Sequence, residues 1–151
     1  MATNAQYTAQ PLIETAVIIG GTANTARDGS GGGFSNLVSG PVGSSAGNGV
    51  GKRIIRASFT QTAAAGVTGG TGDVVRLYMS VDGGTTRRLF AEKAVTAVTS
   101  SGTAIGFRSE IPEVAGMVLS GSTGPAANAA TISATSHAGV TYHVLIESGL
   151  L

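Results

Sequence analysis

The sequence predicts an all-β fold, a single-domain β-sandwich or jelly-roll-like barrel of about eight short antiparallel strands. Apolar and polar residues alternate with a period of two through most of the chain, and no segment has the period of an amphipathic helix. Turn-forming residues separate the alternating runs at intervals of about 8 to 15 residues, as in sandwiches. The length of 151 residues fits one domain. We therefore expect an N-terminal arm at 1–11 and the sandwich at 12–151.

The N-terminal third predicts one strand followed by a long excursion. Leu12 to Ile19 is rich in β-branched residues and is followed by Gly20-Gly21, which predicts a strand and its end. Residues 22–51 are rich in Gly, Ser and Asn, and we expect one short strand there, at Phe34 to Val38. A loop of this length in a compact domain is usually functional or binds something.

The central block has the clearest strand patterns. In Arg53 to Thr60, the alternation predicts a half-buried strand. Its expected core face is Ile55, Ala57 and Phe59, opposite Ile54, Arg56, Ser58 and Thr60. In Asp73 to Val81, the expected core face is Val75, Leu77, Met79 and Val81, opposite Arg76, Tyr78 and Ser80.

A hairpin is predicted after this second strand. Asp82-Gly83-Gly84-Thr85 supplies residues that accept a positive φ, and an alternating run returns from Arg88 to Ala94. The remaining expected strands are Val95 to Val98, Thr103 to Arg108, Met117 to Leu119, Ala130 to Ser136 and Val140 to Glu147. In the last of these, Val140, Tyr142, Val144 and Ile146 form the apolar face.

The composition favours a protein that functions as part of an assembly. Charged residues make up 11% of the chain and the net charge is +1, so little repulsion keeps copies apart. The chain has no cysteine, which excludes disulfides and thiolate chemistry. Its N-terminus has no basic residue before an apolar run, and the stretch from Ala16 to Ile19 is too short to span a bilayer. We expect synthesis in the cytoplasm and no membrane partner.

Four motifs resemble catalytic or ligand sites, and the first three fail on context. Ser45 lies in a G-x-S-x-G pattern, but glycines follow it where a helix is needed. Gly51-Lys52 resembles the end of a phosphate-binding loop, but it leads into a strand and Arg53 replaces the Ser or Thr. His137 and His143 have no clustered carboxylates to complete a metal site.

The fourth motif is the carboxylate pair Glu110 and Glu113, which flanks Pro112 in an expected turn. Their separation in the fold does not follow from the sequence, so a glycosidase pair stays open. The absence of tryptophan and an aromatic content of 5% weaken sugar binding. We expect no enzyme activity, no small-molecule substrate, no cofactor, and no catalytic, cofactor-binding or metal-ligating residue.

The basic residues favour cross-strand ion pairs over nucleic-acid binding. They alternate with apolar positions and are partly matched by carboxylates, whereas a nucleic-acid binder has a clear positive excess and stacking aromatics. The basic set is Lys52, Arg53, Arg56, Arg76, Arg87, Arg88 and Arg108, and the carboxylates are Asp73, Asp82, Glu92 and Glu110.

Several segments together resemble a recurrent set of small phage-encoded virion proteins. They are Thr22 to Gly31, Arg53 to Ala57, Ala65-Gly66, Val75 to Tyr78, Asp82 to Phe90, Glu92 and His143 to Gly149. The resemblance covers roughly residues 20 to 148 and departs from the family pattern at Gly29 to Gly51 and in the glycine-containing loop that begins near residue 120. Among such proteins the chain is most similar to capsid decoration (cement) proteins.

The resemblance implies a virion location on the outer capsid surface. It implies a β-rich homo-oligomer, a trimer, bound to the major capsid protein and made in the host cytoplasm. A clamp of this kind works through many weak contacts repeated by symmetry. We expect residues 1–11 and 22–51 to make the contacts. A tail, fibre or baseplate component and an adhesin-like carbohydrate-binding module are the alternatives.

Overall fold

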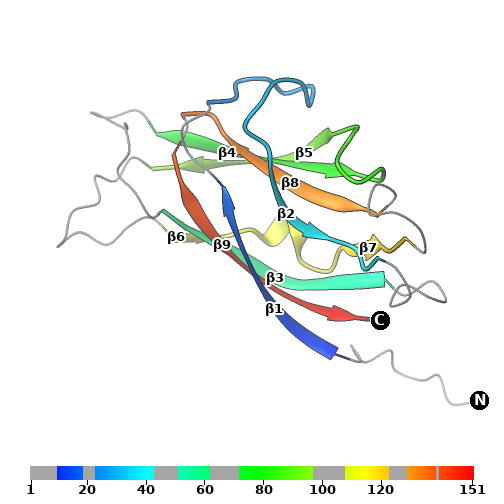
Figure 1. Cartoon of the computed structure of the whole chain (residues 1–151). Helices are drawn as coiled ribbons and strands as arrows, with labels where there is room; N and C mark the ends of the chain where they lie inside the picture. The colour runs from blue at the N-terminus through cyan, green and yellow to red at the C-terminus, as the bar shows by residue number, and fades with distance from the viewer. Residues whose placement is uncertain are drawn as a thin grey trace, which may run out of the picture.

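The computed structural model describes residues 10–18, 23–42, 51–61, 72–96, 108–122, 129–138 and 140–151. These residues form nine strands in two antiparallel sheets that face each other (Figure 1). The predicted all-β sandwich is therefore confirmed.

The first sheet, called sheet A here, has the strand order β1-β9-β3-β6, and β7 also pairs with β3. Its strands are β1 (Gln10–Ile18), β9 (Tyr142–Leu150), β3 (Gly51–Gln61), β6 (Arg108–Glu110) and β7 (Val118–Ser120). The first and last strands of the chain are neighbours. Sheet A therefore forms only when both ends of the described chain come together.

The second sheet, sheet B, has the order β2-β8-β4-β5. Its strands are β2 (Ser35–Ser39), β8 (Thr131–Ser136), β4 (Asp73–Ser80) and β5 (Arg88–Val95). A single 3₁₀ turn, η2 (Pro112–Val114), separates β6 from β7. The expected strands near the N-terminus, near residue 35 and after residue 116 are all present. Of the two expected between residues 95 and 108, Val95 ends β5, Arg108 begins β6, and residues 97–107 lie outside the described part.

The core lies between the two sheets, where both inner faces contribute aliphatic side chains. Phe59 of β3 and Tyr142 of β9 are fully buried and meet edge to face, with ring centroids 5.3 Å apart. Ile54, Leu77, Ile132 and Ile146 are buried around them. The alternation predicted for β9 is confirmed, since Tyr142, Val144 and Ile146 are buried and His143 is exposed.

The predicted core face of β3 is wrong at one position, Ile55. Residue pairing with β9 passes from Ile54 opposite Ser148 to Arg56 opposite Glu147, so Ile55 is the extra residue of a β-bulge. Ile54 is consequently buried and Ile55 is 47% exposed. Beyond the bulge the prediction holds, because Ala57 and Phe59 are in the core.

The prediction for β4 fails at Val81, which is 73% exposed because the strand ends at Ser80. Val75 and Leu77 are buried as expected, and Met79 packs against the core. The opposite face of β4 is buried too, at Arg76, Tyr78 and Ser80. Strict alternation of exposed and buried residues is therefore lost.

The loop at residues 23–34 is what covers that outer face of sheet B. The Tyr78 hydroxyl donates to the carbonyl oxygen of Ala26 at 2.7 Å, and Arg76 donates to that of Asn24 at 2.8 Å. Phe34 meets the Tyr78 ring edge to face. The described part of the 22–51 excursion thus packs on its own domain. In the expected N-terminal arm, Gln10 and Pro11 belong to β1, and residues 1–9 lie outside the described part.

The predicted hairpin between β4 and β5 is confirmed. Gly83 and Gly84 have φ values of 67° and 92°, in the region that glycine tolerates best. The Asp82 carboxylate accepts hydrogen bonds from the backbone amides of Thr85 at 3.1 Å and Thr86 at 2.8 Å. The Ser80 hydroxyl and these amides hold the pKa of Asp82 well below its ordinary value, because they stabilise its charged form.

Replacing Gly40 with alanine is expected to destabilise the fold by about 1 to 3 kcal/mol. Gly40 follows β2 and lies against the backbone at Ser120, whose carbonyl oxygen an added Cβ would overlap. Urea denaturation measures the loss. Gly116→Ala is the control, because its positive φ (82°) gives the alanine some backbone strain but no atom lies within 4 Å of the added Cβ. A smaller loss of stability for Gly40→Ala than for Gly116→Ala would contradict the close approach of Gly40 to the Ser120 backbone.

Candidate interaction surface

The outer face of sheet A presents apolar side chains to solvent. On β1, Ile13 is 74% and Val17 is 42% exposed, and they alternate with residues that turn toward the core. The bulged Ile55 adds a third exposed aliphatic group on β3. Within the described residues, no other segment covers these three side chains. A sheet face of this composition is typical of a surface that contacts another protein.

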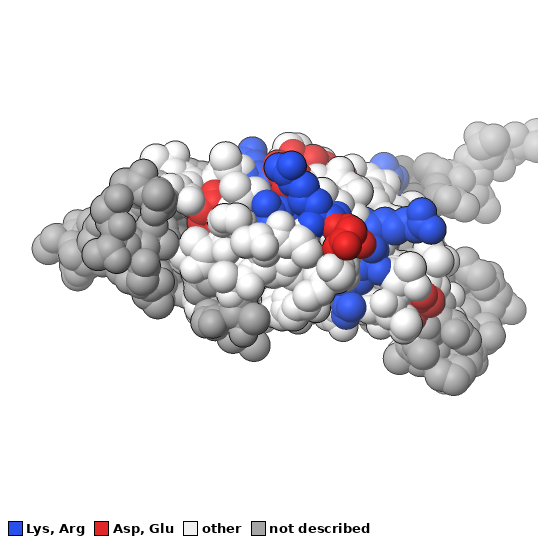
Figure 2. Space-filling view, turned by 90° about the horizontal axis from the view of Figure 1, so that it is seen from above, with Lys and Arg blue, Asp and Glu red and all other residues white. Residues whose placement is uncertain are grey.

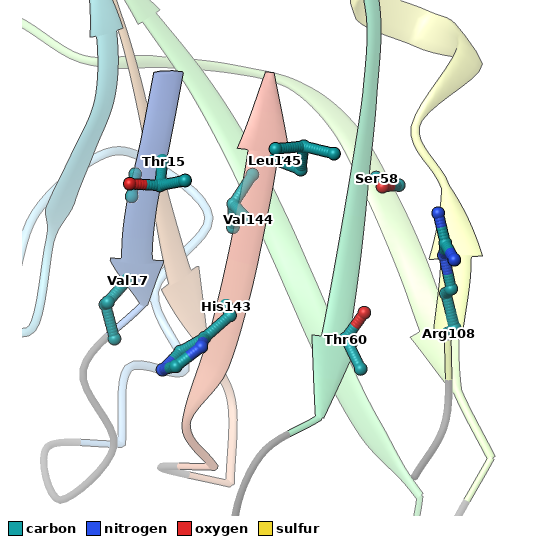
Figure 3. Close-up of a pocket in the computed structure, with 9 residues that line it drawn as sticks. Thr15, Val17, Ser58, Thr60, Arg108, His143, Val144 and Leu145 are labelled. Atoms are coloured by element: carbon teal, nitrogen blue, oxygen red, sulfur yellow. The ribbon is translucent and has the colours of Figure 1, made fainter. Parts of the chain in front are cut away.

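A shallow hollow of about 470 Å³ lies on this face. Its walls come from four neighbouring strands of sheet A (Figure 3). Leu145 extends from β9 toward β3, His143 leans toward Val17 at the end of β1, and Arg108 lies on β6 at the far side (Figure 3). The remaining labelled residues of the lining are Thr15, Ser58, Thr60 and Val144. The hollow is mainly apolar and neutral, with one arginine at its rim.

The charges around the hollow are few and partly neutralised. Arg56 donates to the Glu147 carboxylate at 2.6 Å, and the two residues are directly opposite on β3 and β9. The hydrogen bond and the charge of Glu147 raise the pKa of Arg56. Arg108 forms no ion pair with any described carboxylate. A partner for this face would therefore be mainly apolar or neutral, with an acidic group near Arg108.

Lys52, the lysine of the loop that resembles a phosphate site, is turned inward. It begins β3, is buried, and donates to the Glu14 carboxylate of β1 at 2.7 Å. Ser148 of β9, which lies between these strands, donates to the other Glu14 oxygen at 3.0 Å. The strand context expected for Lys52 is confirmed, and its charge is used inside the sheet. The ion pair between Lys52 and Glu14 could not be predicted from any local sequence pattern, because it depends on the order of the strands in the sheet.

The two candidate histidines lie on different sheets. His137 follows β8 in sheet B, where its Nδ1 is 3.3 Å from an Arg76 nitrogen, and His143 is on the outer face of sheet A. Glu110 and Glu113 are exposed at the end of β6 and in η2, which is the turn expected at Pro112. In the described part of the chain, no three His, Asp or Glu residues group closely enough to hold a metal ion. Ser45 lies outside the described residues.

A buried polar cluster around Asp73 was not anticipated from the sequence. The Asp73 carboxylate accepts hydrogen bonds from the hydroxyls of Tyr142 at 2.7 Å and Ser136 at 2.6 Å. It also accepts from the backbone amides of Val74 and Ala138, both at 2.7 Å. Burial, together with the neighbouring carboxylate, raises the pKa of Tyr142 far above its ordinary value. Because the carboxylate is enclosed and fully engaged, its role is to join β4, β8 and β9.

Basic side chains gather in a band across the outer side of sheet B, where acidic groups interrupt them (Figure 2). Arg27 and Arg76 both donate to one oxygen of Glu92, at 3.0 and 2.8 Å. These two hydrogen bonds lower the pKa of Glu92. Cross-strand ion pairs facing solvent were expected for the basic residues as a group. Arg76 on β4 and Glu92 on β5 form such a cross-strand pair, but Arg76 is buried. Asp73 and Asp82, also expected to pair with arginines, bind hydroxyls and amides.

No protein-family model matches this chain, and no curated protein or solved structure does. The described residues include no helix with the length and apolar character needed to cross a membrane.

Proposed function

We propose that this chain is a non-enzymatic structural protein of a phage particle, a decoration protein that binds the major capsid protein on the outer capsid surface and stabilises the shell. The observation that supports this best is the outer face of sheet A, where Ile13, Val17 and Ile55 are exposed and Val17 helps to line a mainly apolar hollow. The virion assignment itself depends on the sequence resemblance described above.

The outer face of sheet A has the properties that binding to a capsid surface requires. A capsid repeats one binding site many times, so each contact can be weak while the assembled set is effectively permanent. A broad sheet face with few charges contributes to binding through apolar contact, and it needs no reacting group. The one ion pair on this face among the described residues, between Arg56 and Glu147, uses its charges within the chain.

Copy number separates this proposal from its rivals. Quantitative mass spectrometry of particles from the virus that encodes the chain should find hundreds of copies per capsid, in a fixed ratio to the major capsid protein. A few copies, or a few dozen, would contradict a capsid role and favour a tail, fibre or baseplate component. Specific glycan binding by a protein that is absent from particles would favour an adhesin.

Replacing Leu145 with lysine should reduce occupancy on particles by about tenfold or more, because a charge would enter the hollow and lose hydration on docking. Purified particles lacking the protein are incubated with each variant, and bound protein is measured after sedimentation. Ala94→Lys is the matched control, since Ala94 is exposed on β5 of sheet B and the added charge is the same. Equal occupancy for Leu145→Lys and the unchanged chain would exclude this face as the docking surface.

A further inference from the structure

The strands at the edges of the two sheets are not equally protected. An exposed edge offers unpaired backbone groups to another chain, and proteins block this with short strands, bulges and charged residues. In sheet B, β2 has 5 residues with a register shift, and β5 has a bulge at Phe90 and the charged residues Arg88, Glu92 and Lys93. In sheet A, β6 and β7 have 3 residues each.

The remaining edge strand, β1, is neither short nor bulged, and its protective features are limited to Pro11 near one end and the inward-turned Glu14. It has 9 residues, and all of them pair with β9 without a register shift. It contains no lysine or arginine, and its one charged residue, Glu14, turns inward to Lys52. Among the described residues, β1 pairs with β9 alone. A long, regular and nearly uncharged edge is suited to receive a further strand.

The sequence of β1 is complementary to itself when it runs antiparallel. Ile13, Thr15 and Val17 alternate on the outer face, and Thr15 is exposed between the two aliphatic residues. If two copies of the strand meet with Thr15 opposite Thr15, Ile13 lies opposite Val17 on both sides of the centre. On the inner side, Glu14 then lies opposite Ala16, and Leu12 opposite Ile18. In this register the large aliphatic residues meet one another, Glu14 meets only Ala16, and no like charges are directly opposed.

Antiparallel pairings of two β1 strands centred on the residues next to Thr15 bring less compatible side chains together. A centre at Glu14 would oppose two carboxylates directly and set Ile13 against Thr15. A centre at Ala16 would set Val17 against Thr15 and place Ile13 opposite residue 19, beyond the end of β1. Register is specified by such pairings wherever the two faces of a strand differ.

We infer that β1 is a self-association surface, at which β1 of a second copy pairs antiparallel about a two-fold axis centred on Thr15. The pairing joins sheet A of both copies into one continuous sheet. Because this axis is perpendicular to the sheet, the two outer faces point the same way. A pair of copies would thus present two hollows side by side to one partner surface, which strengthens binding through multivalency.

The inference does not require the virion role, since it concerns only the isolated protein. It also differs from the trimer that the resemblance implies. A three-fold axis cannot pair a strand with its own equivalent, so a trimer would have to use a different surface.

Cysteine scanning tests the register directly, because the chain has no cysteine of its own. Directly opposed residues have Cα atoms about 4.5 to 5.5 Å apart, which is within disulfide range. Thr15→Cys should therefore give a covalent dimer on mild oxidation, seen on a non-reducing gel. Ile13→Cys alone and Val17→Cys alone should not, because each residue would be about 14 Å from its own equivalent. An oxidised mixture of Ile13→Cys and Val17→Cys should crosslink.

Sedimentation of the unchanged protein supplies the second measurement, with a concentration-dependent dimer expected. Ile13→Lys should weaken this dimer at least tenfold, whereas Ala94→Lys should leave it unchanged. A monomer at all concentrations, a trimer without the Thr15→Cys crosslink, or equal crosslinking by all three single variants would overturn the inference. Failure here would leave particle binding and its dependence on Leu145 untouched, so the two proposals can fail separately.

Discussion

Replacing Asp73 with alanine is expected to destabilise the fold by about 3 kcal/mol or more, because several buried donors would lose their acceptor at once. The hydroxyls of Tyr142 and Ser136 and the amides of Val74 and Ala138 all donate to this carboxylate. Each buried donor left unpaired costs about 1 to 3 kcal/mol, reduced where the structure relaxes or water enters. Urea denaturation monitored by tyrosine fluorescence measures the change.

Tyr142→Phe is the matched control for this cluster. It removes one hydroxyl and leaves the carboxylate with its three other donors, so the expected loss is about 1 kcal/mol. The double variant should lose less than the sum of the two single losses, since both remove the same hydrogen bond. A loss for Asp73→Ala no larger than that for Tyr142→Phe would mean that the cluster does not join the strands as described.

Replacing Phe59 with alanine is expected to cost about 3 to 5 kcal/mol, which is the usual range for deleting a buried aromatic ring. Phe59 is fully buried between the sheets and contacts the Tyr142 ring edge to face. Its removal would leave a cavity that the surrounding strands, held by backbone hydrogen bonds, cannot fill. The midpoint of chemical denaturation should fall accordingly.

Phe90→Ala provides the comparison for this second variant. It deletes the same atoms from the bulge in β5, where the ring is 36% exposed. The loss should be less than half that of Phe59→Ala, because less apolar surface returns to water and no closed cavity forms. Equal losses would indicate that Phe59 is not at the centre of the core.

Interactions between neighbours in the chain were predictable from the sequence. Alternation in β9 identified its buried face, because successive side chains of a strand point to opposite sides. Asp82-Gly83-Gly84 identified the hairpin, because turn conformation depends on residues adjacent in sequence. The context of Lys52 was also clear, since the alternating pattern begins right after it.

The candidate site was predictable only in part. The low charge indicated a protein that contacts other proteins, but it did not indicate where. The exposure of Ile55 on the outer face of sheet A depends on a bulge, which no local pattern marks because it exists only in pairing with β9. No local pattern indicated that the described part of the 22–51 excursion covers Tyr78 and Arg76 of the same domain, and its contact with partners stays a prediction.

By itself, then, the sequence determined the all-β class, most of the strands and the turn that joins β4 to β5. Only the tertiary structure decided that Glu14 meets Lys52, that Asp73 joins three strands, and that β1 is left at an edge. The reason is physical. Strand period and turn geometry arise from residues a few positions apart, whereas sheet order brings together residues as distant as Glu14 and Ser148, and their pairing depends on the whole fold.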